Sequence, residues 1–186
     1  MGTECLPERV EGPRLVLRRW TVDDLDLLAD AVTRNLDHLR PWMPWIASEP
    51  LAVHERRGLL ESWEREWLGG GEVVMGIFEG GEVVGGSGLH RRRGPDGLEI
   101  GYWVDCAHLG KGIATETAAM LTTAALALEE ISFVEIHHDK ANVRSRRVPE
   151  RLGFVFLGES AAEPTAPSEI GIGCRWQMTE EHWLER

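Results

Sequence analysis

The pattern of hydrophobic and polar positions divides the chain into alternating and helical segments. In residues 13–20 the leucines face one side while Val16 and Arg18 face the other, which is the period of a half-buried β-strand. Three further strands are expected at residues 72–78, 82–89 and 98–105. Short Gly-rich turns separate these three segments, and connections this short join antiparallel neighbours. The middle of the chain therefore predicts an antiparallel sheet.

Helical spacing of apolar residues predicts two helices in the first half of the chain. Thr21 and Asp24 have the spacing of a capping box, and apolar residues then recur at helical intervals to about Arg34. A second helix is expected over residues 51–68, where a run of three glycines stops it. Three prolines interrupt residues 35–50 between the two helices, which predicts a structured loop.

The second half of the chain alternates helices with strands. Helices are expected at residues 113–129 and 146–152, and strands at residues 133–138, 154–157 and 170–178. The connection between strand 98–105 and strand 133–138 is long enough for a crossover. These two strands can therefore lie parallel.

Composition narrows the class of protein. A length of 186 residues favours one domain, and three cysteines without a Cys-x-x-Cys pair argue against a disulfide framework and indicate a reducing compartment. The formal net charge of −11 works against binding a phosphate backbone, so nucleic acid is not an expected partner. There is no run of 18 apolar residues, and we expect a soluble, cytoplasmic protein without a membrane partner. His137 and His138 lie on opposite strand faces, so no metal is expected there.

The first candidate site is a Gly-rich junction between a strand and a helix. It consists of Gly110, Lys111, Gly112, Ile113, Ala114 and Thr115. The free N–H groups and dipole of a helix N-terminus favour a phosphate or pyrophosphate. Gly112 stands where a P-loop needs Ser or Thr, and Thr115 where a dinucleotide fingerprint needs Gly, so neither ATP nor NAD is indicated. An ordinary tight turn without a ligand is the alternative.

A second motif follows the strand expected at 133–138. It begins Asn142-Val143-Arg144-Ser145 and continues as Val148-Pro149-Glu150-Arg151-Leu152-Gly153-Phe154. Together with the Gly-rich junction and the strand at residues 99–104, this motif resembles the GNAT superfamily of acyl-CoA-dependent N-acetyltransferases. Residues 14–18 and 38–45 are most similar to the Rim branch, the ribosomal-protein N-terminal acetyltransferases and their relatives.

The resemblance covers nearly the whole chain and implies its fold. We expect a single GNAT domain over residues 1–186, of the α/β (α+β) class. The sheet is expected to be mixed and mostly antiparallel, with about six to seven strands and helices on both faces. Relatives of this kind often pair as homodimers.

The resemblance also implies a site for acetyl-CoA as co-substrate. Backbone N–H groups from Gly110 to Thr115 would hold the CoA pyrophosphate, and Asn142 would hydrogen-bond the pantetheine arm. Arg144 and its neighbours Arg146 and Arg147 would flank the CoA site. Leu109 departs from the family pattern, which usually has a long polar side chain at this place.

The resemblance implies that acetyl transfer proceeds by direct attack of an amine on the thioester, without a covalent enzyme intermediate. A strand N–H near Trp103 or Val104 would polarise the carbonyl. The resemblance points to Glu99 as the general base, with a structural carboxylate as the alternative. Ser145 would protonate the leaving thiolate, and its alternative role is an N-cap of the short helix.

The sequence contains two further clusters, one of arginines and one of large apolar residues. Arg91, Arg92 and Arg93 precede a turn and are expected to form a solvated run. A group of large apolar residues is expected either in the core or in the wall of an acceptor pocket: Trp42, Met43, Trp45, Trp63 and Trp67.

The expected function is transfer of an acetyl group from acetyl-CoA to a primary amine, with a protein N-terminal α-amino group as the leading acceptor. The enzymatic alternative is a small-molecule amine, such as an antibiotic, a polyamine or an amino acid, because the fold does not fix the acceptor. A non-catalytic acyl-CoA-binding module is the alternative from another class.

Overall fold

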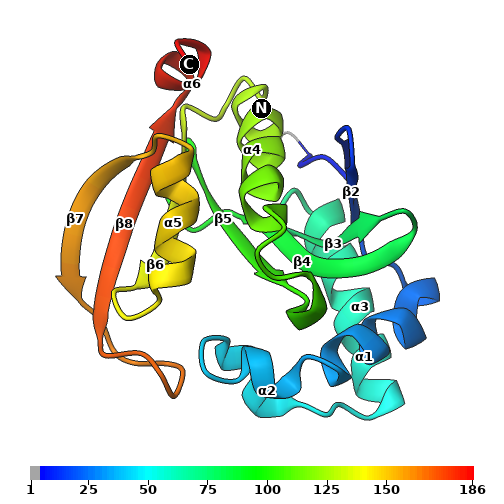
Figure 1. The fold of residues 1–186 in the computed structure, drawn as a ribbon. Helices are drawn as coiled ribbons and strands as arrows, with labels where there is room; N and C mark the ends of the chain where they lie inside the picture. Colours follow the sequence, from blue (N-terminus) through cyan, green and yellow to red (C-terminus); the bar gives the residue numbers. More distant parts are fainter. Residues whose placement is uncertain (1–4) are drawn as a thin grey trace.

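The computed structural model describes residues 5–186 and is built around one twisted sheet (Figure 1). Eight strands form it in the order β1-β2-β3-β4-β5-β6-β8-β7. Their bounds are β1 Arg9–Glu11, β2 Leu15–Arg19, β3 Val73–Glu79, β4 Glu82–His90, β5 Gly97–Val104, β6 Phe133–Asp139, β7 Val155–Ala161 and β8 Ile172–Thr179. All neighbours are antiparallel except β5 and β6, which are parallel as predicted.

Helices cover both faces of the sheet (Figure 1). The α-helices are α1 Leu25–Thr33, α2 Leu36–Leu39, α3 Val53–Leu68, α4 Ile113–Leu126, α5 Val143–Arg151 and α6 Glu180–Leu184. Helices α4 and α5 pack together on one face, and α1 and α3 pack together on the other. Each face has its own buried apolar cluster, because successive side chains of a strand point to opposite faces.

The sheet opens between its two parallel strands. Residues 97–99 of β5 pair with residues 133–135 of β6, and the pairing stops there. On its other side β5 stays paired with β4 as far as Val104. The second half of β5 therefore has a backbone edge that no strand of residues 5–186 covers, facing α5 and the end of β6.

The predicted fold class is confirmed, with local corrections. The sheet has eight strands where six to seven were expected, because β1 is too short to show an alternating pattern. The expected loop at residues 35–50 contains α2 and a short 3-10 helix, Pro44–Ser48. Helix α4 ends three residues earlier than predicted, at Leu126. Helix α5 begins at Val143 and not at residue 146, since the side chain of Asn142 caps it.

Asp105 fixes the end of β5 against helix α1. Its carboxylate is buried and accepts hydrogen bonds from Arg34 Nε at 2.6 Å, Asn35 Nδ2 at 2.8 Å and the N–H of Ala107 at 2.9 Å. Burial alone would raise the pKa of Asp105, but these hydrogen bonds outweigh burial and lower that pKa to about 2. The turn that leads into α4 is thus anchored by one ionised side chain.

Replacing Asp105 by Asn should lower the free energy of unfolding by about 2 kcal/mol, because the new amide group places a donor among donors. The stabilisation from a carboxylate of depressed pKa is present above its unfolded pKa of about 3.9 and is lost as the pH falls toward 2. Urea unfolding of the wild type and of D105N should therefore differ most at neutral pH and converge in acid. The exposed Asp30→Asn on α1 is the matched control, and an equal loss in both variants contradicts the anchoring role.

Candidate functional site

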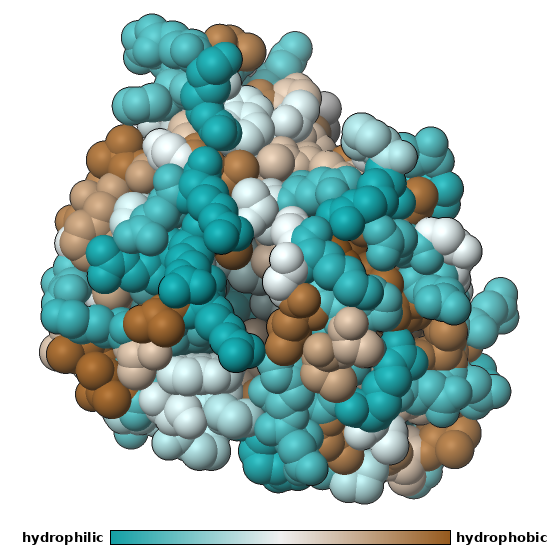
Figure 2. Space-filling model, in the orientation of Figure 1, coloured by the Kyte–Doolittle hydropathy of each residue, from teal (hydrophilic) through white to brown (hydrophobic). Residues whose placement is uncertain are grey.

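The Gly-rich junction forms a cavity with the basic face of α5. This cavity of about 430 Å³ is called the loop cavity here. It is lined by Val104, His108, Leu109, Gly110, Gly112, Ile113, Ala114, Thr115, Arg144, Arg147, Val148 and Arg151. All the predicted phosphate-loop residues line it except Lys111, whose side chain is exposed. Figure 2 shows the surface hollowed between α5 and the N-terminal end of α4, with hydrophilic side chains on the α5 side.

The geometry of the junction suits an anion. Gly110 and Gly112 have φ angles of 77° and 80°, in the left-handed region that favours glycine, and Gly112 is the N-cap of α4. The first intrahelical hydrogen bond of α4 runs from the N–H of Glu116 to the carbonyl of Gly112. The N–H groups of Ile113, Ala114 and Thr115 therefore have no acceptor within the helix, and these residues line the loop cavity. Arg14 holds the loop, since Nη2 donates to the Lys111 carbonyl at 3.1 Å and to Glu116 at 2.7 Å.

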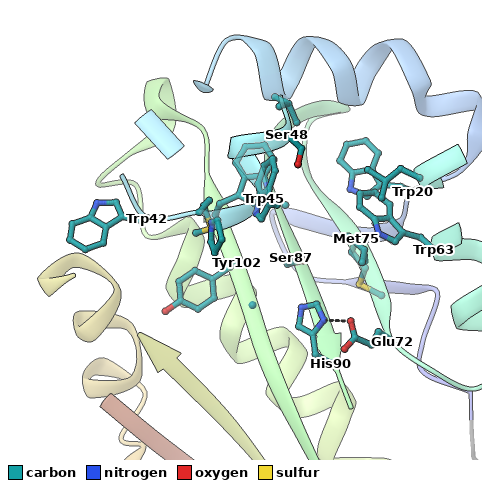
Figure 3. Close-up of a pocket in the computed structure, with 18 of the residues that line it drawn as sticks. Trp20, Trp42, Trp45, Ser48, Trp63, Glu72, Met75, Ser87, His90 and Tyr102 are labelled. Atoms are coloured by element: carbon teal, nitrogen blue, oxygen red, sulfur yellow. Dashed lines mark hydrogen bonds and ion pairs between the residues drawn. The ribbon is translucent and has the colours of Figure 1, made fainter. Parts of the chain in front are cut away.

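A larger cavity, of about 980 Å³, lies on the other side of the opened sheet. We call it the aromatic cavity because its wall is rich in tryptophan (Figure 3). Its large apolar lining residues include Trp20, Trp42, Met43, Trp45, Trp63 and Trp103. Trp67, predicted with this group, packs instead against the core, and its Nε1 donates to the Leu6 carbonyl at 2.7 Å.

Residues of β5 and α5 meet where the two cavities adjoin. The hydroxyl of Tyr102 lies 3.2 Å from the hydroxyl of Ser145 and donates to the Ser145 carbonyl at 3.3 Å. Asn142 accepts from the N–H of Ser145 at 3.1 Å, so Asn142 is the N-cap of α5. The alternative that Ser145 caps this helix is wrong, because Ser145 lies inside the first turn. Its hydroxyl is left to face Tyr102.

Glu99 is a lining residue of the aromatic cavity, but it is held by arginines. Nε of Arg93 donates to its carboxylate at 2.8 Å, and Nη2 of the same guanidinium is also in contact with it. Arg92 approaches it at 4.0 Å. The expectation of a solvated arginine run is wrong for Arg91 and Arg93, which are half-buried, while Arg92 is exposed. Each of the three guanidinium groups pairs with a carboxylate, namely Glu130, Glu72 and Glu99 in turn. The role of Glu99 as a base stays a prediction.

A pair that the sequence did not reveal lies beside Glu99. Nδ1 of His90 and Oε2 of Glu72 are 2.7 Å apart, and both residues line the aromatic cavity (Figure 3). The hydrogen bond from His90, opposed by burial and assisted by Arg92, lowers the pKa of Glu72 to about 2. The two residues are 18 positions apart, and only the register of β3 with β4 brings them together.

The two cavities carry opposite charge. Three arginines line the loop cavity: Arg144, Arg147 and Arg151. Two arginines and six carboxylates line the aromatic cavity, the carboxylates being Glu49, Glu55, Glu72, Glu99, Asp139 and Glu169. One end of the site is thus suited to an anion and the other to a cation. Within residues 5–186 no cluster of three or more potential metal ligands occurs, and no helix is long and apolar enough to span a bilayer.

The chain is similar in sequence and in fold to known acetyltransferases. The family described as Acetyltransferase (GNAT) domain matches residues 14–155. The chain is 29% identical over 147 residues to YdaF of Bacillus subtilis strain 168, a candidate ribosomal N-acetyltransferase, and this match covers 78% of the chain and 80% of YdaF.

Solved structures share the whole fold. RimL, a ribosomal L7/L12 α-N-protein acetyltransferase solved with coenzyme A, superposes with a TM-score of 0.83 at 20% identity, covering 96% of this chain and 99% of RimL. RimJ of Mycobacterium smegmatis, solved with CoA-disulfide, also has a TM-score of 0.83, at 23% identity, and 94% of this chain and 88% of RimJ are covered. At these identities the likeness establishes the fold.

Replacing Gly112 by Leu should weaken acetyl-CoA binding at least tenfold, because the side chain would project into the open space before the helix N-terminus. A ligand at a hundredfold excess over its Kd adds about 2.7 kcal/mol to wild-type stability, and most of that gain should disappear in the variant. Calorimetric titration measures the affinity directly.

Gly80→Leu is the matched control for backbone strain. Gly80 has a φ of 59°, nothing lies within 4 Å of an added Cβ, and the residue is in the turn between β3 and β4. Both variants should lose about 1 to 2 kcal/mol of stability from the left-handed backbone, but only Gly112→Leu should lose affinity. Unchanged affinity in Gly112→Leu would place the phosphates elsewhere.

Proposed function

The chain belongs to the acetyltransferase (GNAT) domain family, and from this premise we propose that its acceptor is the α-amino group of a protein N-terminus. The protein is an N-acetyltransferase, and acetyl-CoA is its co-substrate. The similarity to YdaF and to the Rim-type folds supports the proposed acceptor.

One observation carries the proposal: the two cavities adjoin along β5 and α5. On β5, Val104 lines the loop cavity while its neighbour Trp103 lines the aromatic cavity. On α5, Arg144 lines the loop cavity while its neighbour Ser145 lines the aromatic cavity. A CoA molecule with its pyrophosphate at the loop would pass its pantetheine arm along the open edge of β5. Its thioester would then reach the aromatic cavity, close to Ser145.

Charge supports an amine as the acceptor. An alkyl amine is a cation at neutral pH, and the aromatic cavity combines a majority of carboxylates with tryptophan faces. The CoA phosphates would lie at the arginine-lined end. The two substrates would therefore occupy regions of opposite charge on either side of the reacting bond.

The hydroxyls of Tyr102 and Ser145 would serve the leaving thiolate. Burial raises the pKa of Tyr102 above its ordinary value, so its hydroxyl keeps its proton at neutral pH and can act as a donor. Ser145 lies next to it and lines the aromatic cavity. In this arrangement a proton passes to sulfur as the C–S bond breaks, with the serine hydroxyl in turn hydrogen-bonded by tyrosine.

The acceptor is tested by measuring free thiol release from acetyl-CoA across two panels. One panel contains peptides that differ in their N-terminal residue, and the other contains small amines of the antibiotic, polyamine and amino-acid classes. We expect the highest kcat/KM for peptides, and a peptide with a blocked N-terminus should be inert. Preference for a small amine would replace the proposed acceptor, and acetyl-CoA binding without turnover on either panel would favour a binding module.

Replacing Ser145 by Ala should lower kcat several-fold while the thermal midpoint stays within about 2 °C of the wild type, since Asn142 and not Ser145 caps α5. Asn142→Ala is the contrasting variant, because loss of the cap should cost about 1 kcal/mol of stability. Steady-state kinetics and thermal unfolding separate the two effects. A Ser145→Ala enzyme with the wild-type kcat would remove the serine from proton transfer.

A further inference from the structure

We propose that His90, held by Glu72, is the general base that removes the proton from the acceptor amine. This inference rests on the amine acetylation proposed above, but not on which amine is the acceptor. Nothing in the sequence pattern distinguishes His90, which is the last residue of β4. The proposal is carried by the hydrogen-bonding state of the imidazole, by the space around its free nitrogen and by the contrasting surroundings of Glu99.

The Glu72 carboxylate fixes the tautomer of His90. With a pKa lowered to about 2, Glu72 is ionised at neutral pH and can only accept hydrogen bonds. The 2.7 Å contact therefore requires the proton on Nδ1 of His90, which leaves Nε2 of the neutral ring as a free acceptor. This is the arrangement in which a carboxylate orients an imidazole base and stabilises the imidazolium that forms.

Two glycines keep the free nitrogen accessible. A methyl group added at Gly88 would lie 3.0 Å from Nε2 of His90, and one added at Gly101 would lie 3.1 Å from it. The ring therefore lies over a floor of two residues without side chains, on the sheet face that lines the aromatic cavity. Gly101 is two residues from Trp103, whose strand edge is the expected carbonyl-binding position. The nitrogen thus faces the region where an amine would approach the thioester.

Glu99 lines the same cavity, but its carboxylate is already ion-paired. It is opposite His90 in the pairing of β4 with β5, but Arg93 occupies its carboxylate through two guanidinium nitrogens. A carboxylate that accepts a proton there would have to give up this ion pair. His90 needs no such exchange, because protonation of Nε2 strengthens its bond to Glu72.

Charged groups from three parts of the chain surround His90. Glu72 precedes β3, Glu99 lies on β5, and Arg92 follows His90 in the chain with its Nη2 3.4 Å from Nδ1 of the ring. The Arg92 guanidinium is paired with Glu72 at 3.0 Å, and Arg93 is paired with Glu99. The two arginines are thus matched by two carboxylates, and the extra positive charge of an imidazolium lies between both carboxylates.

The ammonium acceptor gives its first proton to Nε2 of His90, directly or through one water, and the neutral amine nitrogen then forms a bond to the thioester carbonyl carbon. The C–S bond breaks, its electron pair stays on sulfur, and the second proton of the nitrogen is released to solvent. The thiolate takes the proton of the Ser145 hydroxyl, the serine oxygen takes the proton of Tyr102, and the tyrosine oxygen regains a proton from solvent. The products are the amide and CoA thiol, and the imidazolium gives its proton to solvent.

The test compares His90→Gln, Glu72→Gln and Glu99→Gln, with the exposed His54→Gln on α3 as the matched control. For each variant, kcat is measured from about pH 6 to pH 9 with the best acceptor of the wild type, and acetyl-CoA affinity is measured by calorimetry. Thermal unfolding establishes that each variant is folded. The wild-type rate on that acceptor is the reference, so a wild type without turnover would count against the proposed function and not against His90.

We expect His90→Gln to lower kcat at neutral pH by at least tenfold, within the range of about 10²- to 10⁴-fold that general-base catalysis supplies. Its acetyl-CoA affinity should be unchanged, and its kcat should go on rising with pH up to about pH 9, because without the base only amine that is already free can react. Glu72→Gln should give a smaller loss, because a neutral amide orients the ring without stabilising its charged form. The loss in His90→Gln should shrink at alkaline pH, where the free amine is already present.

Glu99→Gln separates the two candidate bases. We expect it to lose less activity than His90→Gln at neutral pH and to retain the pH profile of the wild type. If the rate of Glu99→Gln instead goes on rising toward pH 9 while His90→Gln keeps the wild-type profile and rate, the base is Glu99 and the proposal is overturned. If His90→Gln fails to fold, Glu72→Gln decides, since an unchanged rate and profile in that variant would equally overturn the proposal.

Discussion

The early end of the pairing between β5 and β6 is the constraint on which the rest of the site depends. After three paired positions the strands part, and the second half of β5 keeps β4 as its only strand neighbour within residues 5–186. Backbone that lacks a partner in a sheet is costly unless something else satisfies it. In this protein the opening also sets the Tyr102 hydroxyl against α5 and separates an arginine-lined cavity from an acidic one.

A row of polar residues runs across the same sheet at the point where the pairing stops. His90, Glu99, Glu135 and Gln177 occupy neighbouring strands in register, and Glu72, which immediately precedes β3, is hydrogen-bonded to His90 at the end of the row. Each buried carboxylate of the row is matched by a basic group, as in the 2.8 Å contact of Glu135 with Arg175. Removing one member would leave its partner's charge unpaired, and at the end of the row the Glu72 carboxylate holds the imidazole of His90 through Nδ1.

The sequence predicts what depends on neighbours along the chain. The capping box at Thr21, the helix over 53–68 and the Gly-rich turns between the central strands are local, and the structure contains all of them. The resemblance to a family supplied the loop and the motif that begins at Asn142. Contacts between residues far apart in the chain could not be predicted from the sequence, because the packing of the elements decides them. For this reason the half-burial of Arg91 beside Glu130 was not foreseen, and the His90 pair was missed.

The separation of charge along the site affects how the substrates find it by diffusion. A chain of net charge −11 repels a polyanion such as CoA at long range, and salt screens that repulsion beyond a Debye length of about 8 Å. The arginines of α5 act within that distance, so they capture a CoA molecule that has already reached the surface. A cationic acceptor is drawn to the opposite mouth. In the arrangement proposed above, the two substrates would therefore meet the protein at separate places, one at the arginine-lined cavity and the other at the acidic one.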